Sequence, residues 1–276
     1  MKMDNAIVKV KASYYQQFDA DYCLAVPAEG YGGWKKDFIE ISLKHTAFVI
    51  MHAWETGTYS QYPGWYRAVE YLPRAQRICK EVFPLLLPVI RKAGLPVFHV
   101  VGGGDYYKSY PGYARAIAVA GSNPCVKGRV YVDPCAEKLQ RFRYEKSFPG
   151  SHNTEDINKG FANIGFAPNA EPVGEEYIAE NGHQLFCVCQ YHKINHLIYL
   201  GFAINWCVLM SPGGMQEMSS YGVICSVIKD AVTAVENRES ARNESHKEEA
   251  LWRVAIAFGF VFESSDIIEG LKSYTH

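Results

Sequence analysis

Two side chains that could act together as a nucleophile and a base lie where the sequence predicts the ends of buried strands. His52 directly follows an apolar run at 45–51, and Cys207 comes shortly after a second apolar run at 194–200. In an open parallel sheet, ligand sites lie at the carboxyl ends of the strands. An imidazole is a competent base for a thiol near neutral pH. Nucleophilic catalysis by a cysteine is therefore the first hypothesis.

Cys207 is the stronger candidate of the two, because it stands near the start of a helix predicted over 205–221. The unpaired N–H groups and the positive end of the macrodipole at a helix N-terminus favour the thiolate. The same N–H groups can stabilise an oxyanion. The alternative is a small buried apolar residue, which is the commonest role of a free cysteine.

Two further polar side chains are associated with strand ends. His99 lies late in an apolar run at 95–101, and Asp230 follows another at 223–228. We expect His99 either to cap its strand or to line the pocket. The three glycines at 102–104 lack the continuation into a helix that a phosphate-binding loop requires, so they are a weak signal.

A metal site is the alternative reading of a short cysteine- and histidine-rich stretch. It contains Cys187 and Cys189, with His183, His192 and His196 nearby. Zinc sites usually pair cysteines two to four residues apart, and a Cys-x-Cys pair within a helix directs its thiols to different faces. We therefore expect no metal ion, and we expect no cofactor.

The elements that must position these residues alternate between strands and helices. The predicted strands are 45–51, 95–101, 194–200, 223–228 and 260–262, and the predicted helices are 73–94, 183–193, 205–221, 238–258 and 266–274. Such alternation requires right-handed crossovers and a largely parallel sheet with helices on both faces. The sequence therefore predicts an α/β fold.

Two segments lack a clear hydrophobic period. Residues 1–44 carry Gly-Tyr-Gly-Gly-Trp at 30–34 and are predicted to form an irregular N-terminal arm ahead of a domain over 45–276. Residues 104–172 are rich in Tyr, Gly, Pro, Asn and Lys, and are predicted to form an irregular insertion. The insertion either shapes a pocket or is a surface excursion without a role.

Composition limits the classes of partner. Lys and Arg number 28 against 29 Asp and Glu in 276 residues, a net charge of −1, so a nucleic acid is a poor expectation. The apolar runs are too short to span a membrane, and the first residues do not resemble a signal peptide. We expect a cytoplasmic protein whose eight cysteines are mostly reduced thiols.

Four segments resemble the isochorismatase-like cysteine hydrolases, a family that includes nicotinamidases and carbamoylsarcosine amidases. Gly201-Phe-Ala-Ile-Asn-Trp-Cys-Val208 is similar to the family pattern Gly-Val-x-Thr-x-x-Cys-Val, and it is the most specific match. Asp230-Ala-Val-Thr-Ala234 resembles the Asp-Ala segment that lies downstream of the cysteine in that family. Thr46-Ala-Phe-Val-Ile-Met-His52 and Arg91-Lys-Ala-Gly-Leu-Pro-Val-Phe-His99 resemble its first two strand steps. The resemblance covers 46–103 and 183–272.

The resemblance implies a three-layer α/β/α Rossmann-like fold with a central, mainly parallel, six-stranded sheet. It implies hydrolysis of a C–N bond in a small amide-type substrate through a thioester on Cys207. It also implies a non-proline cis peptide before the cysteine, here at Ala203–Ile204, and an oxyanion site formed by backbone groups of Ala203, Ile204 and Cys207. Such enzymes form homo-oligomers, and the aromatic N-terminal arm would suit a subunit contact.

The family triad of Cys, Asp and Lys is not complete in this chain. The aspartate position is occupied by His52, and residues 171–177, where the lysine is expected, contain none. A rewired triad would use His52 as the base and Glu175 or Glu176 to orient it, as the third group does in other Cys-His-acid sites. We expect Trp54, His99, Asn205 and Trp206 to line the substrate pocket.

Two alternatives to catalysis remain. The first is a catalytically impaired relative that keeps the fold and binds a ligand or a partner, which the missing Asp and Lys favour. The second is a thiol-based redox sensor, which would need an accessible low-pKa Cys207 and a resolving cysteine. No second thiol is placed beside Cys207 by the sequence.

Overall fold

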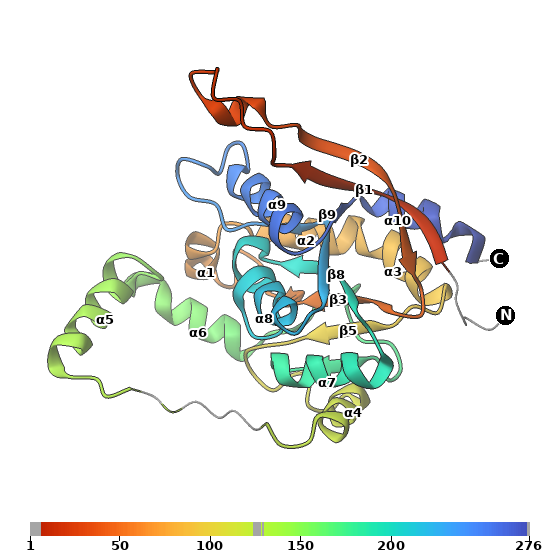
Figure 1. Cartoon of the computed structure of the whole chain (residues 1–276). Helices are drawn as coiled ribbons and strands as arrows, with labels where there is room; N and C mark the ends of the chain where they lie inside the picture. Colours follow the sequence, from red (N-terminus) through yellow and green to blue (C-terminus); the bar gives the residue numbers. More distant parts are fainter. Residues whose placement is uncertain (1–6, 124–127, 129, 275–276) are drawn as a thin grey trace.

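The computed structural model describes residues 7–123, 128 and 130–274 (Figure 1). A single sheet of eight strands lies at its centre. In spatial order the strands are β2 (Gly33–Ser42), β1 (Ile7–Gln16), β10 (Val261–Phe262), β9 (Ile224–Thr233), β8 (His196–Phe202), β3 (Thr46–Met51), β5 (Val97–Val100) and β7 (Tyr177–Ala179).

The prediction of six strands is wrong, although a six-stranded parallel sheet exists within the eight. The six strands from β10 to β7 pair in parallel with their neighbours. The two additional strands, β1 and β2, form an antiparallel hairpin that joins the sheet through the pairing of Ser13 with Val261. Residues 7–42, expected to be irregular, therefore extend the sheet, whereas residues 1–6 lie outside the described part.

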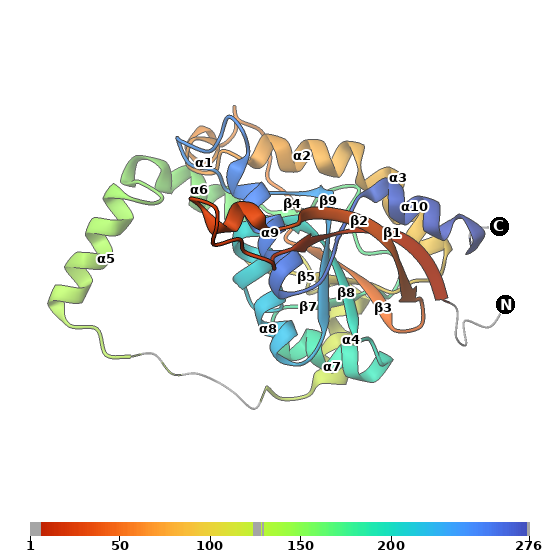
Figure 2. The same cartoon turned by 45° about the horizontal axis from the view of Figure 1, so that its top comes forward.

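Helices cover both faces of the sheet, so the predicted three-layer α/β/α architecture is confirmed (Figures 1 and 2). The first face packs against α2 (Leu72–Glu81), α3 (Phe83–Lys92) and α10 (Ser264–Leu271). The second face packs against α4 (Pro111–Ala120), α7 (Gly182–His192), α8 (Met215–Ser220) and α9 (Ser245–Ala257).

The central strands follow from apolar runs that can be buried on both faces. Every residue of β3, β5 and β8 is buried, which is typical of the middle of a parallel sheet. Helix α7 begins where the Asn181 side chain accepts a hydrogen bond from the Gln184 amide at 3.0 Å. It ends at Lys193, which adopts a left-handed conformation.

The predicted helix over 205–221 is wrong in its middle. The chain instead forms a short π-helical turn, Ile204–Val208, and the separate helix α8. Pro212 cannot donate a backbone hydrogen bond, and Gly213 has φ of 78°. The chain then turns back on itself, because a Cβ at Gly214 would lie only 2.8 Å from the carbonyl oxygen of Cys207.

The insertion contains more regular structure than the sequence indicates. It holds α4, α5 (Pro134–Lys146), α6 (Thr154–Ala162) and the short strand β6 (Gly165–Phe166), and residues 124–127 and 129 within it are outside the described part. Strand β6 pairs with β4 (Trp54–Glu55) beside α1 (Pro63–Ala68). Figures 1 and 2 both show α5 standing away from the body of the molecule. No helix in the described ranges is long and apolar enough to cross a membrane.

Candidate active site

His52 and Cys207 follow the carboxyl ends of two neighbouring central strands. Strands β3 and β8 pair in parallel, with Met51 opposite Gly201, so the residues after each strand emerge at the same edge of the sheet. Gly201 has φ of 113°, and a Cβ there would lie 2.0 Å from the Met51 carbonyl oxygen. Only glycine therefore permits this approach of the two strand ends.

His52 has a left-handed backbone conformation with φ of 48°, and its amide donates to the Val100 carbonyl at 3.1 Å. Non-glycine residues rarely adopt this conformation, and when they do they cluster at functional sites. The turn directs the imidazole away from the strand, toward Gly102. A Cβ added at Gly102 would lie 3.1 Å from Nε2 of His52.

The imidazole of His52 is neutral at physiological pH. Burial lowers its pKa to about 4, and a backbone hydrogen bond to Val101 opposes this shift. Its Nδ1 is buried and has no hydrogen-bond partner within the described part of the chain. The ring stacks on Trp54, whose Nε1 donates to the Tyr106 hydroxyl at 2.9 Å.

Cys207 lies in the π-helical turn that follows β8 and is partly exposed. The Ala203 carbonyl accepts hydrogen bonds from the amides of Trp206 and Val208. The Asn205 side chain fixes the turn to the neighbouring chain, because it donates to the Val235 carbonyl at 2.8 Å and accepts from the Val235 amide at 2.9 Å.

The non-proline cis peptide before the cysteine is present, but it is Phe202–Ala203 rather than the expected Ala203–Ile204. Ile204 follows it and is fully buried. Among the described residues, the Ile204 amide makes no backbone hydrogen bond outside its own turn. This N–H group is thus one of the backbone donors near Cys207 that a bound oxygen could use.

Tyr71 connects the surroundings of His52 with those of Cys207. Its side chain and His52 line the same small cavity, together with Trp54, Gln76 and Phe202. Burial raises the pKa of Tyr71, and the proximity of the Cys207 thiol raises it further. The sequence did not identify Tyr71 as a site residue, because it lies in an irregular segment and has no motif.

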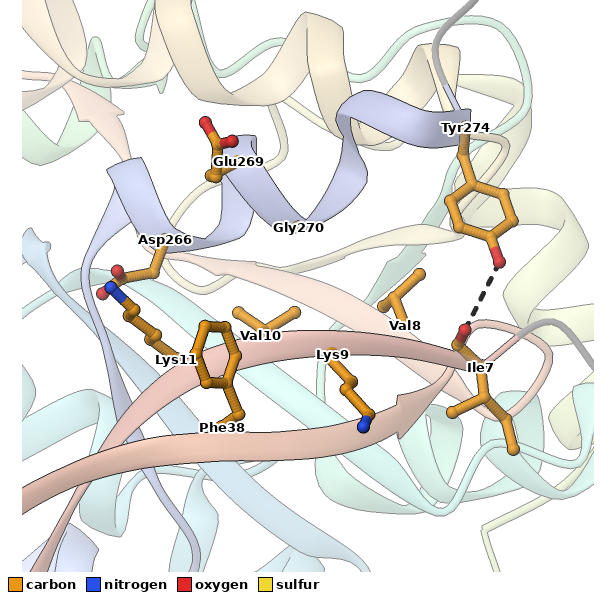
Figure 3. Close-up of a pocket in the computed structure, with 10 residues that line it drawn as sticks. All are labelled: Ile7, Val8, Lys9, Val10, Lys11, Phe38, Asp266, Glu269, Gly270 and Tyr274. Atoms are coloured by element: carbon orange, nitrogen blue, oxygen red, sulfur yellow. Dashed lines mark hydrogen bonds between the residues drawn. The ribbon is translucent and has the colours of Figure 1, made fainter.

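The cavity beside His52 is small, with a volume of about 10 Å³. Aromatic side chains from the loop and the insertion pack around it, since Trp54 contacts Phe161 edge to face and Phe161 lies against Trp65. The insertion therefore covers this edge of the sheet. A larger cavity of about 520 Å³ lies elsewhere, between the β1–β2 hairpin and α10 (Figure 3), and its lining contains no cysteine or histidine.

Glu175 and Glu176 do not contact His52. They precede β7, at the amino end of that strand, whereas His52 follows the carboxyl end of β3. Glu176 instead accepts from Arg91 Nε at 2.7 Å and from His99 Nε2 at 2.9 Å. Glu175 forms an exposed ion pair with Arg115. The expected contact of His52 with either glutamate is wrong. Spacing along the chain did not show where β7 begins, and therefore did not show that both glutamates lie at the opposite edge of the sheet from His52.

The Glu176 carboxylate is strongly stabilised in its charged form. Burial opposes ionisation, but the hydrogen bonds from His99 and Arg91 outweigh it and lower the pKa of Glu176 to about 2. Burial also lowers the pKa of His99, so the imidazole is neutral and donates its Nε2 proton to the carboxylate. This network holds the amino end of β7 against α3.

The remaining predicted pocket residues occupy different environments. His99 is fully buried in the network with Glu176 and does not line the cavity beside His52. Trp206 is exposed, and Asp230 is bonded to the Ser264 side chain and amide. Glu180 was missed by the sequence analysis. It directly follows β7 at the carboxyl edge of the sheet and accepts from the Tyr107 hydroxyl at 2.7 Å.

The cysteine- and histidine-rich stretch does not assemble a metal site in the described ranges, where no group of three or more His, Cys, Asp or Glu side chains could hold an ion. Cys189 is buried in the core, and Cys187 contacts His183. His196 bonds the Ser226 hydroxyl at 2.8 Å.

Comparison with known proteins supports the resemblance at the level of the fold. A cysteine hydrolase from Pseudomonas syringae pv. phaseolicola 1448A superposes with a TM-score of 0.51 at 12% identity, covering 85% of this chain and 95% of that chain. At this identity the likeness concerns the fold alone. The chain therefore shares the α/β fold of this cysteine hydrolase.

Two further solved structures are similar, with lower scores. An isochorismatase family protein from Burkholderia thailandensis gives a TM-score of 0.46 at 14% identity, covering 83% of this chain and 96% of that chain. N-carbamoylsarcosine amidase from Thermoplasma acidophilum gives 0.43 at 15%, covering 79% and 96%. No family model and no curated protein matches the sequence.

Proposed function

We propose that the chain is a cysteine-dependent hydrolase that cleaves a C–N bond in a small amide-type substrate through a thioester on Cys207. The observation that carries this proposal is the placement of His52 and Cys207 after the parallel-paired ends of β3 and β8. A neutral imidazole held in a left-handed turn stands at that edge, and Tyr71 lies near both groups.

In the proposed reaction, the Cys207 thiol gives its proton to His52 as the sulfur attacks the substrate carbonyl carbon. His52 then returns that proton to the departing nitrogen, and the C–N bond breaks to leave an amine and a thioester. Water, deprotonated by His52, attacks the thioester and releases the carboxylic acid and the thiol. Backbone N–H groups of Ile204 and Cys207 stabilise the oxyanion in both steps.

The roles of the neighbouring residues follow from their contacts. Asn205 holds the turn that carries Cys207, because both polar atoms of its amide bond Val235. Ala203 shapes the turn through its carbonyl, which accepts two amides. Trp54 stacks on the imidazole of His52, and Trp206 is exposed beside Cys207 in the chain, so each offers an aromatic contact to a substrate. Neither Glu175 nor Glu176 has a role in this chemistry.

The proposal includes a small-molecule substrate, a cytoplasmic location and a homo-oligomeric enzyme that binds neither nucleic acid nor membrane. The free thiols Cys23 and Cys135 are exposed, which suits a reducing compartment. The near-zero net charge suits a small ligand rather than a nucleic acid.

A catalytically impaired relative that binds a ligand or a partner is the second candidate. It is favoured by the cavity of about 10 Å³ beside His52, which would hold at most one water molecule. It is also favoured by the buried Nδ1 of His52, which no described side chain bonds or orients.

The deciding experiment measures alkylation of Cys207 by iodoacetamide against pH, with peptide mapping to assign the modified cysteine. Wild type is compared with His52→Ala and with a control, His152→Ala, which changes an exposed histidine. If His52 activates the thiol, His52→Ala slows alkylation at pH 7 at least tenfold and His152→Ala leaves it unchanged. A panel of small primary amides is then screened for a covalent acyl adduct by intact mass.

If Cys207 is not alkylated, or if all three proteins are alkylated at equal rates, the hydrolase proposal is wrong. Binding of a ligand or a partner is then the remaining function. An adduct lost in Cys207→Ser, with amine release in solution, would establish turnover.

A further inference from the structure

Two projecting segments of the molecule carry apolar side chains that no described part of the chain covers. The first is the tip of the β1–β2 hairpin, residues 17–32, where Phe18, Tyr22, Leu24 and Val26 are exposed. The second is the arm formed by residues 130–150, which contains α5. Here the exposed apolar side chains are Val130, Tyr131, Val132, Leu139, Phe142, Tyr144 and Phe148.

Helix α5 lacks the support that a helix of its length needs. It contains 13 residues, none of them buried, and it packs mainly on the 3-10 turn Ser151–Asn153 at its own base. Isolated helices of this length are marginal in water, and most helices are stabilised by tertiary packing of one face. Cys135, Leu139 and Phe142 are spaced four and three residues apart, so they form one unpartnered stripe.

The hairpin tip, in contrast, has a fixed shape that presents its apolar side chains. The Asp21 amide donates to the Pro27 carbonyl at 3.0 Å, and the Asp21 side chain accepts from the Cys23 amide at 2.9 Å. A Cβ at Gly30 would lie 2.8 Å from the Asp19 carbonyl oxygen, so the two sides of the tip pack tightly. The exposure of Tyr22 is therefore a property of a folded element.

The two segments have opposite charge. The tip contains three acidic side chains and no basic one, namely Asp19, Asp21 and Glu29. Helix α5 contains four basic side chains, Lys138, Arg141, Arg143 and Lys146, against two acidic ones, Glu137 and Glu145. Complementary charge around apolar contacts is typical of a specific protein interface.

The tip and the arm are separate projections of the molecule, since Figure 1 shows the hairpin tip at the top and the α5 arm at the left. A two-fold dimer uses the same surface of both subunits, so any contact from tip to arm is repeated from arm to tip. Two complementary elements that project separately from one molecule allow such a reciprocal contact.

We propose that a second copy of this chain docks here, with the hairpin tip of each copy packed on the α5 arm of the other. The contact buries the stripe of Cys135, Leu139 and Phe142 against Phe18, Tyr22 and Leu24. It supplies the tertiary packing that α5 lacks within its own chain.

The association state of the full chain tests this proposal by sedimentation velocity over micromolar concentrations. We expect wild type to sediment at twice the 31.1 kDa chain mass. Leu139→Glu should raise the dissociation constant at least tenfold, because it places a charge in the apolar contact and opposite an acidic tip. The matched control is Leu85→Glu in α3, since Leu85 is 68% exposed and Leu139 is 66% exposed.

Crosslinking locates the contact independently. Cys23 in the tip and Cys135 in the arm are both exposed free cysteines. Isotopically labelled and unlabelled protein are mixed and treated with a short bismaleimide, so that a crosslink between chains is recognised by its mixed mass. We expect a Cys23–Cys135 crosslink between chains that is lost in Cys23→Ser and in Leu139→Glu, whereas Leu85→Glu retains it.

A monomeric wild type would overturn the proposal, and so would a dimer that Leu139→Glu and Leu85→Glu leave equally intact. Because the readout is mass and not activity, these results are independent of whether Cys207 is catalytic.

Discussion

The imidazole of His52 lies parallel to the indole of Trp54, with ring centroids 4.8 Å apart and an angle of 14° between the planes. The indole is itself fixed by its hydrogen bond to Tyr106. One face of the imidazole is therefore covered by an aromatic ring rather than by water. This arrangement is a physical source of the low pKa of His52, because desolvation disfavours the protonated form.

The first prediction concerns the protonation of His52. Its pKa is about 4 because of burial, so the Cε1 proton resonance should not shift between pH 5 and 8. Trp54→Ala admits water and should raise the pKa of His52 toward the ordinary value for histidine. Proton NMR titration checks both, with resonances assigned through His52→Gln. A wild-type His52 that titrates near pH 6.5 would contradict the buried environment.

The second prediction concerns Gly102, whose added Cβ would lie 3.1 Å from Nε2 of His52. Gly102→Ala should displace the imidazole by a few tenths of an ångström and slow Cys207 alkylation at pH 7 by about tenfold. Gly128→Ala is the control, because a Cβ there meets no atom of the described residues within 4 Å. Equal alkylation rates in the two variants would show that the imidazole position does not affect the thiol.

The third prediction concerns Asn205, which makes two hydrogen bonds to the Val235 backbone. Asn205→Ala should lower the free energy of unfolding by about 2 kcal/mol, because each bond contributes about 1 kcal/mol. It should also change the alkylation rate of Cys207, which lies two residues away in the same turn. Asn169→Ala, which loses one bond to the Cys79 carbonyl, is the control for urea unfolding. An unchanged alkylation rate in Asn205→Ala would mean that the turn keeps its shape without the amide.

The fourth prediction concerns the dependence of stability on pH. The pKa of Glu176 is lowered to about 2 in the folded chain from an ordinary value of 4.5. The carboxylate therefore stabilises the fold fully above pH 4.5, and this contribution is lost as the pH falls toward 2. Its size at neutral pH is about 3 kcal/mol.

Glu176→Gln should remove this contribution, so its unfolding free energy should fall less than that of wild type between pH 5 and pH 2.5. Glu175→Gln is the matched control, since the Glu175 side chain is largely exposed and its ion pair with Arg115 contributes little. If the free energy of unfolding depends on pH in the same way in wild type and in Glu176→Gln, the hydrogen bonds from His99 and Arg91 do not stabilise the charged carboxylate of Glu176.

The sequence predicts the central strands well because their burial determines their composition. Strands β3 and β8 are buried on both faces, so each is a continuous apolar run. The strand was predicted to end at Gly201, and β8 instead ends one residue later, at Phe202. The φ of 113° at Gly201 explains why a glycine is needed there, which no pattern in the run could show.

The β1–β2 hairpin was missed although its pattern is present. Val8, Val10 and Ala12 are buried and alternate with the exposed Lys9 and Lys11, which is the two-residue period of a strand with one buried face. The run is short of large apolar residues, and the glycine-rich segment that follows favoured an irregular arm. The alternation of buried and exposed residues identifies β1 as a strand only once it is known that α10 covers one face of it.

The glutamates show a different limit of sequence reasoning. Spacing placed Glu175 and Glu176 near the base, but β7 is only three residues long and begins just after them. Which end of a strand a residue occupies depends on where that strand starts. A three-residue strand gives too weak a pattern to fix its ends.

The two edges of the sheet have a consequence for the solubility of the protein. An open edge strand can recruit another chain through its unpaired backbone, which is a route to aggregation. Here one edge is β2, which carries Lys35, Lys36 and Asp37 in succession, and the other is β7, which is only three residues long. The charged side chains of β2 disfavour pairing with another chain at that edge, and β7 is too short to pair extensively at the other. The sheet is therefore a poor template for fibril growth.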